Sequence, residues 1–390
     1  MKYTVASLFA GVGGICKGFE TAKTDNSKYE LIWANEIDEY ATITYKTNFK
    51  HPIFQCDIND ILFPEKSNNV EHFDKINSLI GSKPIDILNG GFPCQAFSIA
   101  GYQKGFEDER GNLFWAVINT VKLISQKNNK PRILFLENVK NLMSHDNGNT
   151  YRVIKSEIEK LGYIVKEHVL NTMFFSDLPQ NRERIYVVCF RDKRDADKFT
   201  FFENLDKYEK NFTKEERANQ IKNIIDYSKK VDDKYYYTKQ KYPRYFISKE
   251  DYDLIPINKR NEVRINLDED INELYQFYQV RRGMYVRKNK NNVCPTLTAN
   301  MGTGGHNVPL IRDNYGIRKL TPEETFKLQG FPVGYGYELP KLINGKRYPD
   351  SYLYKQAGNA VSVPVIRLIA TEILKVLELN DLDENNTSNN

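Results

Sequence analysis

The spacing of apolar residues divides the chain, and its first half alternates strand and helix patterns. Short apolar runs typical of buried strands recur between stretches with helical periodicity. Strands are predicted at residues 3–9, 31–35, 85–88, 133–136 and 184–190. One helix is predicted to end near residue 21, and further helices are predicted at residues 39–47, 113–124 and 150–161. This order predicts an α/β fold with a parallel, doubly wound sheet.

After residue 190 the pattern becomes irregular, with charged segments rich in Tyr, Asn and Lys. We interpret this region as a second, smaller domain. A further helix is predicted to begin after Thr321, which is the expected N-cap, with Pro322 at the first helical position. A final helix over residues 362–377 is expected to pack on the first domain, and the acidic, Asn-rich end is expected to be disordered. The predicted divisions are residues 1–190, 191–316, 317–380 and 381–390.

Composition fits an ordinary globular protein. With 390 residues, 40% of them hydrophobic, the chain can bury a sizeable core. No apolar run approaches the roughly 20 residues that span a bilayer, and the amino terminus lacks a signal-peptide pattern, so a cytoplasmic protein without membrane contact is expected. The five cysteines are scattered, which argues against a disulfide framework and a structural zinc. The scarcity of histidine argues against His-centred catalysis, and no metal is expected.

One cysteine stands where a nucleophile belongs. The run Gly90-Gly91-Phe92-Pro93-Cys94 follows the predicted strand at residues 85–88. Open α/β folds bind ligands at the carboxyl ends of their strands. A thiolate is the reactive form of cysteine, and nearby positive charge favours it. Cys94 is therefore predicted to act as a nucleophile.

A glycine-rich turn, Phe9-Ala10-Gly11-Val12-Gly13-Gly14, joins the first strand to the first helix. Its backbone N–H groups could approach a nucleotide-like ligand, although such a turn can also be purely structural. Cys16 and Phe19 stand where the dinucleotide and phosphate-loop patterns require Gly and Lys, which disfavours a nicotinamide dehydrogenase. Glu36 could accept hydrogen bonds from ribose and Asp57 from an adenine amino group. These features predict an adenosine cofactor without a pyrophosphate.

Three charged residues are candidates for the same crevice. Glu137 ends the strand at residues 133–136, where a buried carboxyl group needs a function or a partner. Held in an apolar crevice its pKa would rise, so it could donate to a ring nitrogen; the alternative is a capping or ion-paired Glu. Arg182 and Arg184 are predicted to lie on one strand face and to stabilise the thiolate and a carbonyl oxygen, unless they are surface residues.

Two segments mix cations with aromatic rings. Residues 234–242 and 281–288 combine Lys or Arg with Tyr, within a net charge of +5. Such segments can meet phosphates and bases, or they can form a solvated basic face.

The motifs together resemble the cytosine-C5 DNA methyltransferase family. Seven blocks stand in the family's order: Ser7 to Gly14, Asn35 to Asp38, Pro93-Cys94-Gln95, Glu137-Asn138-Val139, Gln180 to Arg184, Arg318 to Pro332 and Gln356 to Val361. Two positions depart from the family pattern, Ser7 in place of Asp and Ala360 in place of Ser, and each affects one hydrogen bond on the cofactor side.

The resemblance implies a Rossmann-like methyltransferase sheet and transfer of a methyl group from S-adenosylmethionine to C5 of a flipped cytosine, leaving S-adenosylhomocysteine. It implies that Cys94 adds to C6, that Glu137 contacts N3 and the exocyclic amine, that Arg184 holds the O2 side and that Arg182 supports the thiolate. The implied cofactor residues are Phe9, Ala10, Gly11, Gly13, Gly14, Glu36, Ile37, Asp57, Ile58, Leu113, Asn359 and Val361.

The resemblance also implies contact with double-stranded DNA. Residues 191–316 fall at the family's target-recognition domain, and residues 93–113 are predicted to form a lid over DNA. The candidate DNA contacts are Gln95, Ser98, Thr296, Arg281 and Arg282. Arg281 and Arg282 could read guanine or contact phosphate.

Several alternatives stay open at this point. A tRNA cytosine methyltransferase shares the catalytic motifs, but the long basic and aromatic insert favours duplex DNA. A catalytically inactive DNA-binding protein is disfavoured by the intact Cys94, Glu137 and Arg184. A monomer is expected, and the enzyme is expected to be the modification half of a restriction–modification system with a cognate endonuclease, although a solitary methyltransferase would have the same sequence features.

Overall fold

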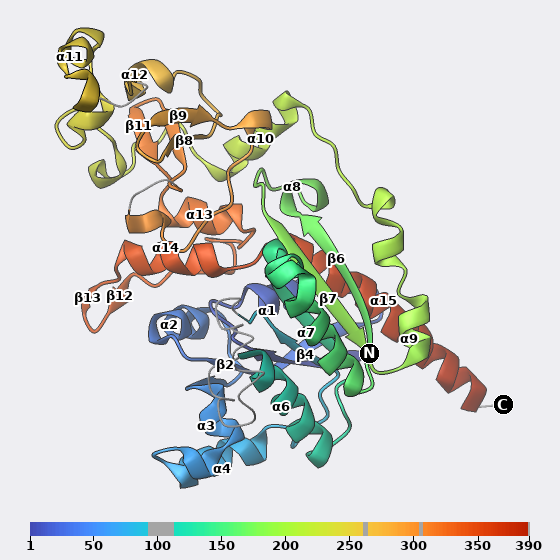
Figure 1. Cartoon of the computed structure of the whole chain (residues 1–390). Helices are drawn as coiled ribbons and strands as arrows, with labels where there is room; N and C mark the ends of the chain where they lie inside the picture. Colours follow the sequence, from blue (N-terminus) through green and yellow to red (C-terminus); the bar gives the residue numbers. More distant parts are fainter. Residues whose placement is uncertain (93–112, 260–263, 304–306, 389–390) are drawn as a thin grey trace. The chain divides into compact units, whose positions relative to one another are not determined.

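The structure is a computed structural model that describes residues 1–92, 113–259, 264–303 and 307–388 (Figure 1). The chain forms two compact units, each made of separate segments. The first unit contains Met1–Asn171, Glu183–Glu209 and Val361–Asn390, and the second contains Thr172–Arg182 and Lys210–Ala360. No helix in the described part of the chain is long and apolar enough to cross a membrane.

The first unit is built on a seven-stranded sheet with the order β3-β2-β1-β4-β5-β7-β6. The strands are β1 (Lys2–Leu8), β2 (Lys28–Glu36), β3 (Ile53–Gln55), β4 (Ile87–Gly90), β5 (Ile133–Val139), β6 (Ile164–Asn171) and β7 (Glu183–Phe190). The strands from β3 to β5 are parallel. Strands β4 and β5 are almost entirely buried, which explains why they appear in the sequence as unbroken apolar runs.

Helices cover both faces of this sheet. They are α1 (Gly14–Thr21), α2 (Glu39–Asn48), α3 (Ile58–Leu62), α4 (Val70–Leu79), α6 (Leu113–Lys127), α7 (Asn149–Lys160), α9 (Lys193–Lys198) and α15 (Val363–Ser388). Helices α3, α4, α6 and α7 share one apolar core with alternate residues of the sheet. On the other face, Phe19 of α1 packs edge-on against Phe135 of β5, with ring centroids 5.3 Å apart. The predicted doubly wound α/β fold is confirmed.

Helix α15 packs against α1 in the first unit. A Cβ on Gly18 would lie 2.3 Å from Ile366, so only glycine allows this approach. The hydroxyl of Tyr29 donates to the carbonyl of Ala370 at 2.8 Å. The prediction that the last helix returns to the first domain is confirmed.

Two details of the first unit differ from the prediction. Strand β7 is antiparallel to both of its neighbours, and β6, which carries the polar run Lys166-Glu167-His168 and is mostly only partly buried, was not predicted. Helix α15 also continues to Ser388, into the segment from residue 381 for which disorder was expected. Asp381 anchors this end: it pairs with Arg132 at 2.6 Å and accepts a bond from Tyr3 at 2.7 Å.

The second unit contains two small sheets and short helices. The four-stranded sheet has the order β11-β10-β8-β9 and all its pairs are antiparallel. The strands are β8 (Tyr278–Arg281), β9 (Tyr285–Lys288), β10 (Leu310–Asp313), β11 (Gly316–Lys319), β12 (Leu342–Ile343) and β13 (Lys346–Arg347). The helices are α8 (Thr172–Phe175), α10 (Lys214–Ile224), α11 (Lys249–Leu254), α12 (Leu267–Asp270), α13 (Pro322–Leu328) and α14 (Asp350–Asn359).

The boundaries of the units differ from the predicted divisions. The first unit extends to Glu209, and residues 317–360 belong to the second unit. The reason is local pairing: β11 pairs with β10, and α13 follows directly. The predicted N-cap is confirmed, since the Thr321 side chain accepts from the backbone N–H of Glu324 and Pro322 occupies the first turn.

Candidate active site

The glycine turn after β1 is held by backbone bonds to the end of β2. The N–H of Ala10 donates to the Asn35 carbonyl at 2.9 Å, and Phe9 has a left-handed φ of 53°. Gly13 also has a positive φ, 84°, and a Cβ there would lie 2.2 Å from the Phe49 ring. At Gly11, with φ 54°, a Cβ would meet no described atom within 4 Å. The turn is therefore tight on one side and open at Gly11.

Glu36 organises this turn through its carboxylate. The side chain, 8% exposed, accepts bonds from Gly11 N–H at 2.7 Å, Ile37 N–H at 3.0 Å and Asp38 N–H at 2.9 Å. Burial raises the pKa of Glu36, while these backbone bonds oppose the rise. Ile37 beside it is 64% exposed, so an apolar surface lies next to a buried acceptor. This combination suits a ligand with a ribose and a flat ring.

The other predicted cofactor residues of the first unit have different environments. Asp57 caps α3, and its Oδ1 accepts bonds from the backbone and side chain of Asn59 at 2.9 and 3.1 Å. Ile58 is 2% exposed and belongs to the apolar core, so its side chain has a packing role. Leu113 begins α6 and is half-buried, Gly14 begins α1, and Val361 is buried.

The carboxylate predicted to be catalytic and one guanidinium form an ion pair across neighbouring strands. Glu137 is the fifth residue of β5 and is 8% exposed. The Nε atom of Arg184, near the start of β7, lies 3.2 Å from its Oε1. The antiparallel register, Val139 opposite Arg184, brings the two side chains together. The sequence predicted that both residues lie at the same crevice, but it did not predict that their strands are antiparallel.

The chain segment that leads toward Cys94 passes beside this pair. A Cβ on Gly91 would lie 3.6 Å from Glu137 Oε2. The side chain of Asn138 donates to the Phe92 carbonyl at 2.7 Å and accepts from the Val139 N–H at 2.8 Å. These contacts of Asn138 were not predicted, although an amide residue next to a predicted catalytic carboxyl group at the end of a buried strand is a signal for them. Cys94, Gln95, Ser98 and residues 93–112 of the predicted lid lie outside the described residues.

Arg182 does not share a strand face with Arg184, because β7 begins at Glu183. It is 2% exposed and donates to backbone carbonyls of its own unit: to Leu297 at 3.0 Å, to Gly358 at 3.2 Å and to Ala360. The prediction that the two arginines lie on one strand face is therefore wrong. A guanidinium with these bonds fixes loops of the second unit.

The predicted DNA and cofactor residues of the second unit lie at several places. Arg281 ends β8, and Arg282 is exposed in the turn to β9 with a φ of 52°. Thr296 donates through its hydroxyl to the Asn181 carbonyl at 2.6 Å. Asn359 is the last residue of α14 and is exposed. Thr296 is thus tied to the chain just before Arg182.

Comparison with known proteins identifies the chain's relatives. Residues 3–375 match the family model for C-5 cytosine-specific DNA methylase. The chain is 46% identical over 375 residues to the Type II methyltransferase M.Bsp6I of Bacillus sp. (strain RFL6), covering 95% of this chain and 98% of that protein. It is 35% identical over 379 residues to the Type II methyltransferase M.HaeII of Haemophilus aegyptius, covering 97% and 95%.

Solved structures give the same fold. The Entamoeba histolytica methyltransferase EhMeth superposes with a TM-score of 0.59 at 18% identity, covering 97% of this chain and 99% of that one. The S. pombe Dnmt2 methyltransferase gives 0.58 at 16% identity, covering 96% and 99%. The resemblance inferred from the sequence motifs is confirmed. The chain belongs to the C-5 cytosine-specific DNA methylase family and is a DNA cytosine-C5 methyltransferase.

Proposed function

We propose that this methyltransferase modifies one cytosine in a specific duplex sequence through a covalent bond between Cys94 and C6, and that it is the modification enzyme of a restriction–modification system. One observation supports the placement of the chemistry. The chain leaves β4 at Gly91, next to Glu137 Oε2, and the Asn138 amide holds the following carbonyl, that of Phe92. Gly91 and Phe92, the two residues before the nucleophile motif, therefore lie beside Glu137 and Asn138.

The chemistry requires each of these groups. Cytosine C5 is a poor nucleophile until a thiolate adds to C6, so the Cys94 sulfur forms a bond to C6 and the ring electrons move to C5. Glu137 contacts N3 and the exocyclic amine, and Arg184 contacts the O2 side. After methyl transfer the C5 proton leaves, the C5–C6 double bond re-forms and the Cys94 sulfur departs. Because C6 is hidden in a stacked duplex, the cytosine is flipped out first, at a cost of a few kcal/mol.

The first unit fits S-adenosylmethionine as methyl donor, which supplies an electrophilic methyl sulfonium when bound. Glu36 has two carboxylate oxygens with about four acceptor positions, and three backbone bonds leave one for a ribose hydroxyl. The exposed Ile37 side chain offers an apolar surface for adenine, and Asp57 offers its Oδ2 to the exocyclic amine. The open space at Gly11 lets the ligand approach the backbone.

The second unit is proposed to be the part of the enzyme that recognises duplex DNA. The enzyme is proposed to act as a monomer. Arg281 and Arg282 stand at the end of the β8–β9 hairpin, which is a suitable position for a phosphate or a guanine edge. Thr296 is proposed to position backbone near the flipped base, and Arg182 to hold the adjacent Leu297 carbonyl in place. Gln95 and Ser98 are proposed as DNA contacts next to the nucleophile.

The test is base-resolution sequencing of cytosine methylation on a plasmid that carries the gene, in a host without its own cytosine methylation. Wild type is expected to methylate one sequence context, and Cys94→Ala to methylate none. Arg194→Gln, a change at a surface helix of the first unit, serves as a control that keeps methylation. Absence of DNA methylation with wild type, or methylation that survives Cys94→Ala, contradicts the proposal.

A further inference from the structure

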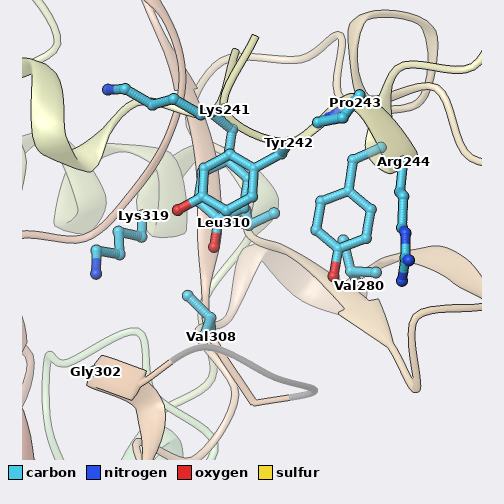
Figure 2. Close-up of a pocket in the computed structure, with 11 residues that line it drawn as sticks. Lys241, Tyr242, Pro243, Arg244, Val280, Gly302, Val308, Leu310 and Lys319 are labelled. Carbon is cyan, nitrogen blue, oxygen red and sulfur yellow. The ribbon is translucent and has the colours of Figure 1, made fainter. Parts of the chain in front are cut away.

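A cavity of about 460 Å³ lies within the second unit, and its lining residues include none of the catalytic residues named above. Its walls come from the segment around Tyr242, strands β8 and β10, Gly302 and Lys319 (Figure 2). The volume falls within the roughly 300–1,000 Å³ typical of small-ligand sites.

Three tyrosines form one wall, and their ring planes are nearly parallel. Tyr237 and Tyr242 stack with centroids 4.2 Å apart and an interplanar angle of 16°. Tyr245 lies 6.2 Å from Tyr242 at an angle of 10°. Backbone bonds hold this wall: Tyr237 N–H donates to the Ile317 carbonyl at 2.8 Å, and Tyr245 N–H donates to that of Tyr242 at 2.9 Å. The rings are therefore arranged before any ligand arrives.

The cavity floor is apolar and belongs to the core of the unit. Val280, Val308 and Leu310 line it and are 6%, 6% and 1% exposed. They pack in one cluster with Tyr237 and Tyr245. Tyr242, in contrast, is 36% exposed, which is unusual for a ring that also stacks. An apolar floor below an exposed aromatic wall suits a flat, unstacked ring.

The charged side chains that line the cavity are all cations. They are Lys241, Arg244 and Lys319, and no carboxylate lines the site in the part of the chain that the structure describes. Lys241 donates to the Asp233 carbonyl, and Lys319 lies over the Tyr354 ring, with Nζ 5.0 Å from the centroid. Arg244 is exposed and, among the described residues, has no ion pair. In Figure 2, Arg244 and Lys319 lie to either side of Tyr242. The site therefore favours an anion next to a flat ring.

We propose that this cavity binds an unstacked nucleotide of the DNA substrate, distinct from the cytosine that is methylated. The base stacks at the tyrosine wall above Val280 and Val308, and Arg244 contacts the adjacent phosphate. Base–aromatic stacking and a cationic neighbour are the usual means of holding a single-stranded nucleotide. The inference rests on the proposed function, because it takes duplex DNA as the substrate. A free nucleotide has the same chemistry, and the experiment separates the two sources.

The experiment measures binding of purified enzyme to its methylated-context duplex, once sequencing has defined that context. Loss of one stacking contact in Tyr242→Leu is expected to weaken DNA binding by about 5- to 100-fold. Tyr242→Phe keeps the ring and is expected to bind as wild type does. Tyr335→Leu is the matched control, since Tyr335 is 87% exposed in the same unit and does not line the cavity. S-adenosylmethionine binding, measured by calorimetry, is expected to be equal in all four proteins, and equal thermal unfolding curves show that the second unit is folded in each.

A scan with single abasic positions then locates the base. Removing the bound base is expected to weaken binding to wild type and to have no effect on Tyr242→Leu. The proposal is overturned if no abasic position couples to Tyr242, or if Tyr242→Leu binds DNA as wild type does. It is also overturned if free deoxynucleoside monophosphates bind in a Tyr242-dependent manner while DNA binding does not depend on Tyr242. A wild-type enzyme that methylates no DNA contradicts the proposed function instead.

Discussion

Arg184 pairs with Glu137 across two antiparallel strands, with Nε 3.2 Å from Oε1. The two side chains come from strands that are far apart in sequence but adjacent in the sheet. The pairing leaves Oε2 of Glu137 on the side of Gly91, three residues before Cys94 in the sequence. One oxygen of the carboxylate thus has a fixed partner, and we propose that the other contacts the flipped base.

This geometry predicts a large catalytic effect of Glu137→Gln. The amide cannot replace the carboxyl group in proton donation or charge pairing, so single-turnover methyl transfer is expected to fall by about 10²- to 10⁴-fold. DNA binding is expected to change little. Glu183→Gln, one residue before Arg184 and in an exposed ion pair with Lys140, is the matched control and is expected to retain activity. Equal rates for the two variants would refute the role of Glu137.

The glycine turn predicts that two similar substitutions have different effects. Gly13→Ala places a methyl group 2.2 Å from the Phe49 ring and is expected to lower the melting temperature clearly. The methyl group of Gly11→Ala meets no described atom within 4 Å. The only cost to stability is therefore that of placing alanine in a left-handed backbone conformation, about 1–2 kcal/mol. The methyl group points into open space, so Gly11→Ala is expected to weaken S-adenosylmethionine binding instead. Calorimetric titration and thermal unfolding of both variants separate the effects; unchanged cofactor affinity in Gly11→Ala argues against ligand approach at this turn.

His51 predicts a specific pH dependence of stability. Burial lowers the pKa of His51, while Glu20 opposes this, and the ring Nε2 lies 2.6 Å from the Tyr45 hydroxyl. The unfolded chain therefore binds a proton more readily, near pH 6.5. The stability contribution is present above that pH and is lost as the pH falls through the lower folded-state pKa.

Thermal unfolding from about pH 7.5 to about pH 5.5 checks this sign. The melting temperature of wild type is expected to fall more than that of His51→Gln, whose amide can still bond Tyr45 but does not titrate. Parallel curves for the two proteins would exclude His51 as the responsible group.

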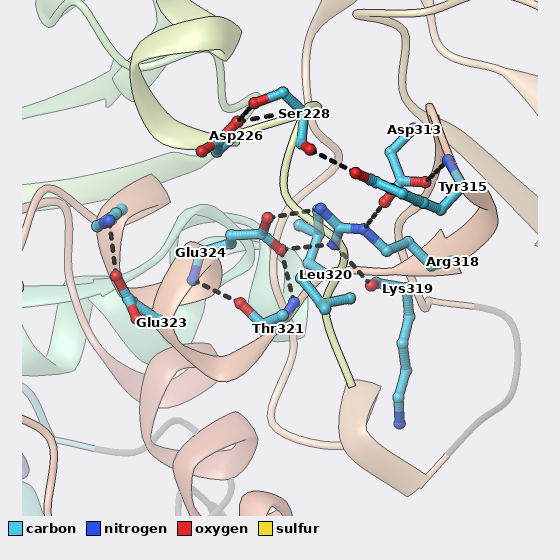
Figure 3. A network of polar contacts seen from close by, with 12 residues as sticks. Asp226, Ser228, Asp313, Tyr315, Arg318, Lys319, Leu320, Thr321, Glu323 and Glu324 are labelled. Atoms are coloured by element: carbon cyan, nitrogen blue, oxygen red, sulfur yellow. Dashed lines mark hydrogen bonds and ion pairs between the residues drawn. The ribbon is translucent and has the colours of Figure 1, made fainter. Parts of the chain in front are cut away.

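A buried ion network joins β11 to α13 and predicts a stability effect (Figure 3). Arg318, 0% exposed, pairs with Asp313 at 2.6 Å and donates to both oxygens of Glu324 at 2.8 Å. Glu324→Gln leaves the buried Arg318 guanidinium with only one of its two carboxylate partners. This is expected to lower the free energy of unfolding by about 3–5 kcal/mol. Glu323→Gln removes an exposed pair with Lys327 and is expected to cost less than about 1 kcal/mol. Chemical denaturation, monitored by hydrogen exchange in β11, measures the free energy of unfolding of both variants. A similar small loss of this free energy in the two variants would contradict the importance of the network.

The sequence was most informative where local patterns decide the structure. Buried strands such as β4 and β5 are unbroken apolar runs, and the Thr321–Glu324 capping box is explicit in the residues. The family motifs identified Glu137 and Arg184, which the sheet then brings together. These features depend on neighbours in sequence or on motif order, so they are readable without coordinates.

The features that were missed depend on long-range pairing. The direction of β7 follows from its partners, and Arg182 looks the same in sequence whether it faces a crevice or three backbone carbonyls. The acidic C-terminal residues suggested disorder, but Arg132 and Tyr3 give Asp381 partners from distant parts of the chain. Composition cannot reveal such partners.

The packing of α15 on α1 has a consequence for biosynthesis. Because the first unit needs both the earliest and nearly the last residues of the chain, it cannot be completed while the ribosome is still adding the C-terminal helix. The second unit consists of a short segment and the stretch Lys210–Ala360, all of which emerges earlier. A chain that stops before α15 therefore contains every residue of the second unit but lacks the helix that packs on α1 in the first.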